Sequence, residues 1–165
     1  MAKKSKEPND IEKLKEEYEK LSKKYSLPDY KKLNELFDIE EVNPETDFLL
    51  RIIRRKIIEK ISNYFRFIEI ILNPSMAPLF LHKKLKNIHS EERALLSRIY
   101  EQIGNLEAET ILLDLEYSEK AEAEFIKKLF HTFNNTIKND LIKSIKNLIN
   151  ETNGENREIK GSYLG

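Results

Sequence analysis

Apolar residues recur along most of the chain at intervals of three and four positions, which is the spacing of one face of an α-helix. An alternation of apolar and polar residues, the pattern of a half-buried strand, does not occur in the sequence. We therefore predict an all-α fold, an antiparallel bundle of four long and two short helices. The expected helices are residues 10–25, 29–37, 44–72, 78–86, 90–117 and 119–149.

Local signals set the expected limits of these helices. Asn43 is expected to cap the helix that begins at Pro44, and Ser90 and Ser118 are expected to cap the two that follow. The run HTFNNTIKND is poor in helix-forming residues, so a kink is expected near residues 134–135.

The chain of 165 residues has the length of one domain. Residues 1–9 are expected to form a disordered basic arm, residues 10–149 a single helical domain, and residues 150–165 a flexible polar tail.

Two segments are candidate protein interfaces. The first is the narrow apolar seam of the helix at residues 10–25, which indicates docking on one surface, either of its own chain or of a second chain. The second is the linker at residues 73–90, where apolar residues stand beside basic ones; the alternative is that this linker closes one end of the bundle. The candidate residues are Ile11, Leu14, Tyr18, Leu21, Tyr25, Met76, Leu79 and Phe80.

Charge is balanced over the whole chain but segregated along it. The 29 basic and 29 acidic residues give no net charge, which excludes a globally basic nucleic-acid-coating protein. Residues 51–90 carry nine basic and two acidic side chains, whereas residues 91–126 carry three basic and ten acidic ones. The two blocks either pair with each other inside the bundle, or the basic block faces an anionic partner.

Arginine is the more informative basic residue, because four of the seven lie at Arg51, Arg54, Arg55 and Arg66. Arg54 falls near the apolar arc of its helix and is expected to extend to solvent or to pair with a buried acid. Asp47 and Glu59 stand four positions from Arg51 and Arg55 and are their expected partners within the helix. The candidate contacts to an anion or nucleic acid are Arg51, Arg55, Arg66, Lys83, Lys84 and Lys86.

The composition argues against catalysis. With no cysteine, the chain has no disulfide, no thiolate metal site and no cysteine nucleophile, and its four glycines form no phosphate-binding loop. The Glu-x-x-His motif of di-iron helical bundles is absent, and His131, between Phe130 and Phe133, is expected to be a partly buried structural residue. We therefore expect no catalytic residue, no metal and no cofactor, and an enzyme is not predicted.

One stretch resembles a known family. The basic helix IIRRKIIEKI at residues 52–61, followed by SEERALLSRIYEQI at residues 90–103, is similar in order to the helical domain of GINS-type replication subunits. The resemblance covers about a fifth of the chain and consists of general amphipathic-helix patterns. The small β domain of many such subunits has no counterpart, and no residue role is carried over.

These observations predict a non-enzymatic helical interaction protein, an adaptor or small subunit of a larger assembly, with a protein partner or a second copy of itself. The alternative is a factor associated with nucleic acid, on ribosomal or replicating complexes, that uses the basic block at residues 51–90. The most apolar stretch, residues 64–72, contains Arg66 and Glu69, so no membrane span is expected. A cytoplasmic location and no small-molecule substrate complete the prediction.

Overall fold

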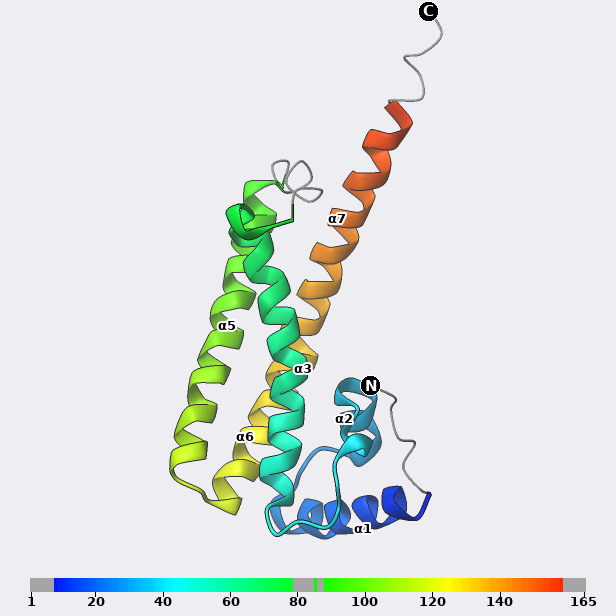
Figure 1. Ribbon diagram of the computed structural model, residues 1–165, viewed down its shortest axis with the longest axis vertical. Coiled ribbons are helices and arrows are strands. Elements are labelled where there is room, and N and C mark those ends of the chain that lie inside the picture. Colours follow the sequence, from blue (N-terminus) through cyan, green and yellow to red (C-terminus); the bar gives the residue numbers. More distant parts are fainter. Residues whose placement is uncertain (1–7, 79–84, 86–87, 159–165) are drawn as a thin grey trace, which may run out of the picture. The chain divides into compact units, whose positions relative to one another are not determined.

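The structure is a computed structural model that describes residues 8–78, 85 and 88–158. Among these residues every regular element is a helix and no strand occurs, which confirms the all-α prediction (Figure 1). In chain order the elements are α1 (Pro8–Tyr25), α2 (Tyr30–Phe37), the 3₁₀ turn η1 (Ile39–Glu41), α3 (Leu49–Leu72), the 3₁₀ turn η2 (Pro74–Met76), α5 (Ser90–Leu115), α6 (Glu119–Thr132), the π-helical turn η3 (Phe133–Ile137) and α7 (Lys138–Glu158). The short helix expected at residues 78–86 lies almost wholly outside the described residues, as do residues 1–7 of the expected arm.

The chain divides into two compact units. Unit 1 comprises residues 1–63 and 106–132, and unit 2 comprises residues 64–105 and 133–165. The helices α3 and α5 each contribute residues to both units.

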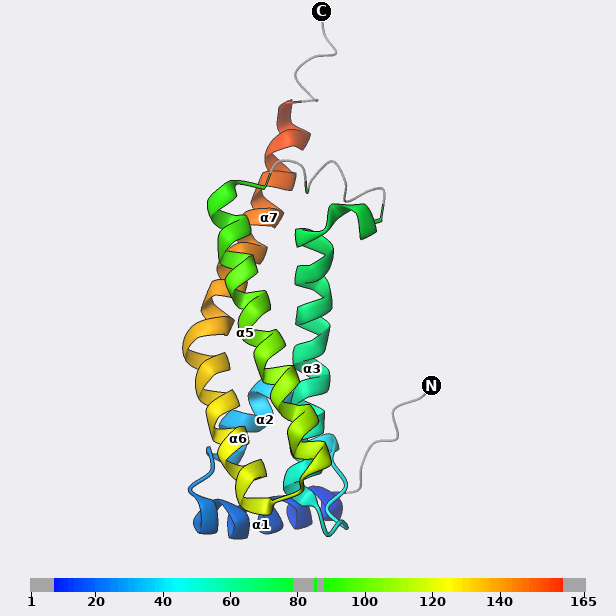
Figure 2. The same cartoon turned by 90° about the vertical axis from the view of Figure 1, so that its left-hand side faces the viewer.

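Unit 1 is built around the first half of α3, the last part of α5, and α6. Helix α1 lies crosswise at the end of unit 1 where α3 begins (Figures 1 and 2), and its last turn contacts Glu119 at the start of α6. The core of unit 1 consists of side chains that are at most 1% exposed and come from five helical elements: Leu14, Tyr18, Leu33, Phe37, Ile39, Leu50, Ile53, Ile57, Ile61, Ala123, Ile126 and Leu129. A helix as widely apolar as α3 was expected to have neighbours on several sides.

Unit 2 is built from the second half of α3, the first part of α5, and α7. Its most buried side chains, all at most 5% exposed, are Ile68, Ile71, Leu85, Leu96, Ile99, Ile103, Phe133, Ile137 and Leu141. Aromatic rings add to this core: Phe65 stacks on Tyr100 with ring centroids 4.1 Å apart, and Tyr64 stacks on Phe133 at 5.9 Å. Offset ring pairs of this kind stabilise by about 0.5–1.5 kcal/mol beyond the area they bury.

The expected start of α3 was wrong. Asn43 and Pro44 belong to a turn, in which the Asn43 carboxamide accepts a hydrogen bond from the Glu45 amide at 3.0 Å. The Thr46 hydroxyl then accepts one from the Phe48 amide at 3.2 Å. Short polar side chains that bind the backbone locally compete with the first helical turn. The helix therefore begins only at Leu49.

The last helical segment also differs from the prediction. The kink expected near residues 134–135 is a π-helical turn, η3, between α6 and α7. Beyond it, α7 continues to Glu158, so residues 150–158 belong to a helix and not to a flexible tail.

Candidate functional site

The apolar seam of α1 faces its own chain. Leu14 and Tyr18 are completely buried, and Ile11, Leu21 and Tyr25 are half-buried. The sequence left two docking surfaces open for this seam, one on its own chain and one on a second chain. In the structure the seam docks on its own chain. Leu14 and Tyr18 therefore do not contact a second chain as the structure stands, because no part of either side chain is accessible.

Polar contacts hold α1 against α6 within unit 1. Lys24 and the Tyr25 hydroxyl both donate to the Glu119 carboxylate, at 2.8 and 2.6 Å, and Lys127 donates to the Tyr25 carbonyl at 3.0 Å. The hydrogen bond from Lys24, followed by that from Tyr25, lowers the pKa of Glu119. Tyr18 donates to the Pro28 carbonyl at 2.7 Å, and its burial raises the pKa of its phenol. These contacts fix α1 as part of unit 1.

Most of the second set of interface candidates, in the linker at residues 73–90, lies outside the described residues. Met76 closes the turn η2, but its side chain is not described, and Leu79 and Phe80 lie outside the described residues. The same is true of Lys83, Lys84 and Lys86. Their assignment as protein or anion contacts stays a prediction.

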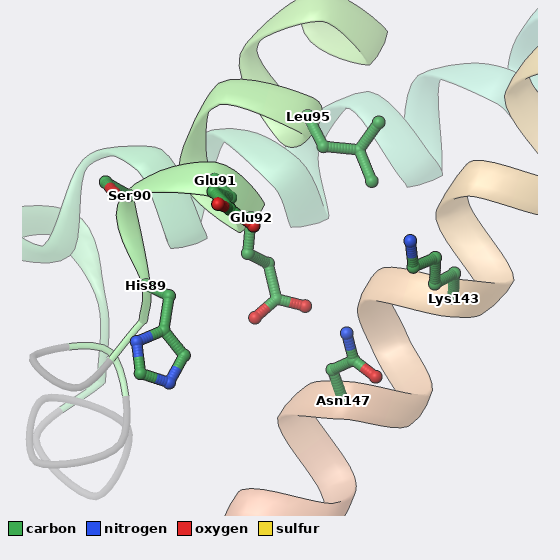
Figure 3. A pocket seen from close by; sticks show the side chains of 7 residues that line it. All are labelled: His89, Ser90, Glu91, Glu92, Leu95, Lys143 and Asn147. Carbon is green, nitrogen blue, oxygen red and sulfur yellow. The ribbon is translucent and has the colours of Figure 1, made fainter.

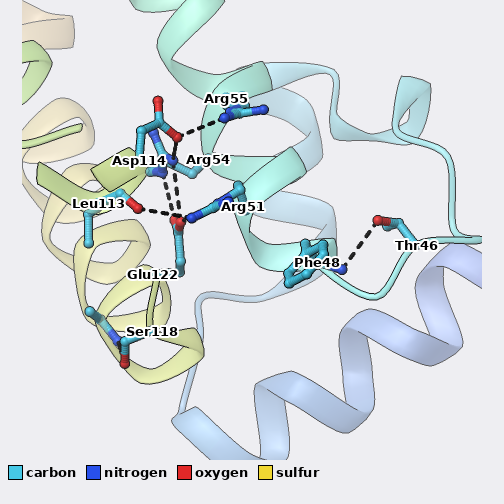
Figure 4. Close-up of polar contacts among 10 residues, drawn as sticks. Thr46, Phe48, Arg51, Arg54, Arg55, Leu113, Asp114, Ser118 and Glu122 are labelled. Atoms are coloured by element: carbon cyan, nitrogen blue, oxygen red, sulfur yellow. Dashed lines mark hydrogen bonds and ion pairs between the residues drawn. The ribbon is translucent and has the colours of Figure 1, made fainter. Parts of the chain in front are cut away.

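The arginines of α3 form an ion-pair cluster inside unit 1 (Figure 4). Arg54 is 1% exposed and donates through Nε to Glu122, which is completely buried, at 2.6 Å; its Nη2 donates to Asp114 at 2.7 Å. Arg51 donates to the Leu113 carbonyl at 3.2 Å and to Glu122 at 3.5 Å. The expectation that Arg54 pairs with a buried acid is thus confirmed, and basic α3 pairs with acidic residues of α5 and α6.

The partners expected within α3 are not the ones observed. Arg55 donates to Asp114 at 2.9 Å instead of Glu59, and Arg51 turns to Glu122 instead of Asp47. Carboxylates on neighbouring helices approach the buried side of α3, and they replace partners that would lie on its exposed surface. Hydrogen bonds from Arg54, and next from Arg55, lower the pKa of Asp114.

The cluster engages Arg51 and Arg55, two of the three α3 arginines that were predicted to contact an anion. The Arg51 side chain is only 19% exposed, and its guanidinium also lies over the ring of Tyr117, 4.5 Å from the centroid. Arg55 is 53% exposed but paired, and Arg66 is exposed. Burial alone would lower the pKa of Arg54, but hydrogen bonds to Glu122 and Asp114 outweigh that effect and raise it. Arg55 and Arg66 remain accessible, so an anion contact by these two residues stays a prediction.

The described parts of the chain have neither a metal-binding cluster nor a membrane-spanning helix. They contain no group of three or more histidine and acidic side chains that could hold a metal ion. His131, expected to be partly buried, is exposed, which corrects that prediction; it stands on the outer face of α6 while its neighbours Leu129 and Phe133 turn inward. Among the same residues, no helix is long and apolar enough to cross a membrane.

An apolar stripe on α5 was not identified from the sequence. Ile111, Leu112 and Leu115 are 61%, 65% and 76% exposed, and Ala108 precedes them on the same exposed face. Other residues of this helix, such as Leu106 and Thr110, are buried. The signal was present as the run ILLDL at residues 111–115, which places apolar side chains on both sides of the helix.

A hollow of about 540 Å³ adjoins this stripe, between α5 and α6 in unit 1. Apolar side chains line it: Leu112, Leu113, Ala121 and Phe125. Its rim is charged and includes the ion pair between Lys128 of α6 and Glu109 of α5. An apolar floor with a polar rim is the usual composition of a protein-binding surface.

No protein-family model matches the chain, and no curated protein or solved structure matches it either. The assignment of a function therefore rests on the geometry of the chain itself.

Proposed function

We propose that the protein is a non-enzymatic helical adaptor of the cytoplasm, which binds the apolar face of an amphipathic helix from a partner protein. The observation that supports this proposal is the exposed stripe of Ile111, Leu112 and Leu115 beside the apolar hollow. Three large apolar side chains lie on two adjacent turns of α5, and each is more than half exposed. A partner that covers them would remove this apolar surface from water.

The shape and charge of this surface favour a helix as the occupant. The stripe lies along one face of α5, and the hollow continues it toward α6, so ridges of an incoming helix fit the groove between them. In the described part of the chain, Lys120 and Glu116 lie beside the stripe without an ion-pair partner. They provide one charge of each sign for the polar flanks of an amphipathic helix.

The test places a photo-crosslinking amino acid at position 115, with position 149 of α7, also an exposed apolar residue, as the matched control. The crosslinked partner segment is identified by mass spectrometry, and the corresponding peptide is titrated against Leu112→Asp/Leu115→Asp and against Ile149→Asp. We expect the crosslinked segment to be an amphipathic helical peptide. Its affinity for the double variant should fall at least about 100-fold, since each leucine that the peptide buries on binding contributes roughly 1.5–3 kcal/mol. Ile149→Asp should leave the affinity unchanged.

The alternatives give different results in the same experiment. Crosslinks from position 115 to a second copy of the chain, with a doubled mass in sedimentation, would replace the adaptor by a homodimer. Crosslinks that depend on intact nucleic acid and disappear with nuclease would favour the nucleic-acid factor. Equal crosslinking from positions 115 and 149 would contradict a specific surface on α5. Because the substituted leucines are exposed, an unchanged thermal melt should accompany the loss of binding.

A further inference from the structure

A second cavity lies in unit 2, between the beginning of α5 and the middle of α7, with a volume of about 570 Å³. Its lining combines ionic, polar and apolar side chains: His89, Ser90, Glu91, Glu92, Leu95, Lys143 and Asn147 (Figure 3). Ligand pockets for small molecules fall in this range of size, about 300–1,000 Å³. The cavity is separate from the stripe and hollow of unit 1, so its ligand does not depend on the proposed adaptor function.

Glu92 is the unusual residue of this cavity. It is only 8% exposed, and its Oε1 atom is buried without any hydrogen-bond partner. Figure 3 shows the carboxylate extending from the first turn of α5 toward α7. The helix N-terminus favours a negative charge at this position, but a buried carboxylate oxygen without a donor is costly to desolvate. The described residues give this oxygen no donor, and because it is closed to solvent, a ligand in the cavity meets the carboxylate at its other oxygen, Oε2.

Lys143 and Asn147 stand opposite Glu92 on α7. They are four positions apart, so both side chains lie on one face of the helix, and both line the cavity (Figure 3). Lys143 is exposed, and within the described residues it forms no ion pair. The cavity thus offers a buried acceptor on one wall and a cationic donor and an amide on the other, with Leu95 as an apolar contact.

We propose that this cavity binds a small zwitterion of the amino-acid class. The ligand's ammonium group donates to Glu92, its carboxylate accepts from Lys143 and Asn147, and its apolar part lies against Leu95. A simple anion would face the carboxylates of Glu91 and Glu92, and a simple cation would face Lys143. Only a molecule with both charges satisfies both walls.

The test uses the full chain, labelled for nuclear magnetic resonance, and each standard amino acid at roughly 10 mM, ten times the dissociation constant of a weak ligand. Propylamine and acetate serve as probes with one charge each. We expect at least one amino acid to shift the amide signals of residues 88–96 and 141–149, and to bind at least tenfold more tightly than either single-charge probe. Glu92→Gln and Lys143→Gln should each weaken that binding at least tenfold, while Glu101→Gln, on an exposed part of α5, should not change it.

Three results would overturn the proposal: no shift with any amino acid, binding that Glu92→Gln leaves intact, or propylamine binding as tightly as the best amino acid. Thermal melting without ligand provides a separate check. Removing an unpartnered buried charge should leave the melting temperature of Glu92→Gln equal to or above that of the parent chain. A marked decrease would mean that Glu92 already has a partner within the fold, which also contradicts the proposal.

Discussion

The Arg54–Glu122 ion pair allows the sharpest test of how unit 1 is held together. Both residues are almost fully buried, and two guanidinium nitrogens of Arg54 approach the Glu122 carboxylate, at 2.6 and 3.3 Å. We consider the single variants Arg54→Met and Glu122→Leu and the double variant that combines them. These substitutions replace each charged side chain by an apolar one of similar length.

Each single variant leaves a buried charge without its main partner. Glu122→Leu leaves the buried Arg54 guanidinium with Asp114, at 2.7 Å, as its remaining carboxylate partner, and we expect it to lower the free energy of unfolding by about 3 kcal/mol, the lower end of the cost of breaking a buried pair. Arg54→Met leaves Glu122 with only the longer contact from Arg51, at 3.5 Å, and should cost a similar amount. The double variant removes both charges together, and Asp114 keeps Arg55 as its partner. It should therefore lie within about 2 kcal/mol of the parent chain, because an apolar replacement of a whole buried pair is often neutral or stabilising.

Urea unfolding, followed by circular dichroism and by tyrosine fluorescence, measures these differences. With a slope near 2 kcal/mol per molar urea, each single variant should shift the midpoint by roughly 1.5 M, and the double variant by less than about 1 M. Removal of the exposed pair between Lys20 and Glu17 by Lys20→Met is the control, with an expected effect below about 0.5 kcal/mol. A single-variant loss below about 1 kcal/mol, or a double-variant loss equal to the sum of both, would refute a buried and coupled pair.

Three further predictions concern smaller features. Asp114→Asn should destabilise the chain more at pH 7 than near pH 3. The lowered pKa of Asp114 means that its contribution is complete well above the unfolded value of about 3.9 and declines as the pH falls toward and through the lower folded-state pKa. Urea unfolding at both pH values would show this, and an equal effect at both would contradict it. Gly104→Ala should raise the melting temperature, by the equivalent of about 0.5–1 kcal/mol, because the new methyl group meets the Phe65 ring at an ordinary contact distance of 3.6 Å; a lower temperature would mean that the contact is too close. Ser118→Ala should cost about 0.5–1 kcal/mol in chemical denaturation, since the Ser118 hydroxyl caps α6 through the Ala121 amide at 3.4 Å, and no loss would show that this cap is energetically silent.

The helices themselves could be predicted because their signals are local. Spacing by three and four marked them, and the pair Asn73-Pro74 and the residue Ser90 marked limits that the structure reproduces within a residue. The start of α3 could not be predicted in the same way. Asn43 and Pro44 are equally suited to a helix start and to a turn, and the choice depends on where Thr46 binds the backbone.

The candidate site depended on contacts that sequence spacing does not reveal. The position of Arg54 on its helix indicated a buried acid, but its partner Glu122 is 68 positions away. The α5 stripe was missed because an apolar run such as ILLDL does not show which of its two sides the rest of the chain covers. Burial of the Glu92 carboxylate could not be predicted either, since it depends on how α7 packs against α5 within unit 2.

The π-helical turn at residues 133–137 has a consequence for how this chain can change during evolution. A turn closed by i→i+5 hydrogen bonds holds one residue more than the α-helical turn it would replace. Deleting one residue there would convert the turn to α-helix and join α6 and α7, while every later side chain keeps the face it has now. Leu141 and the rest of the buried face of α7 would stay in the core of unit 2, whereas a deletion inside α7 itself would rotate every later side chain by about 100°. Homologues should therefore tolerate a single-residue gap in this segment more readily than a gap within α7.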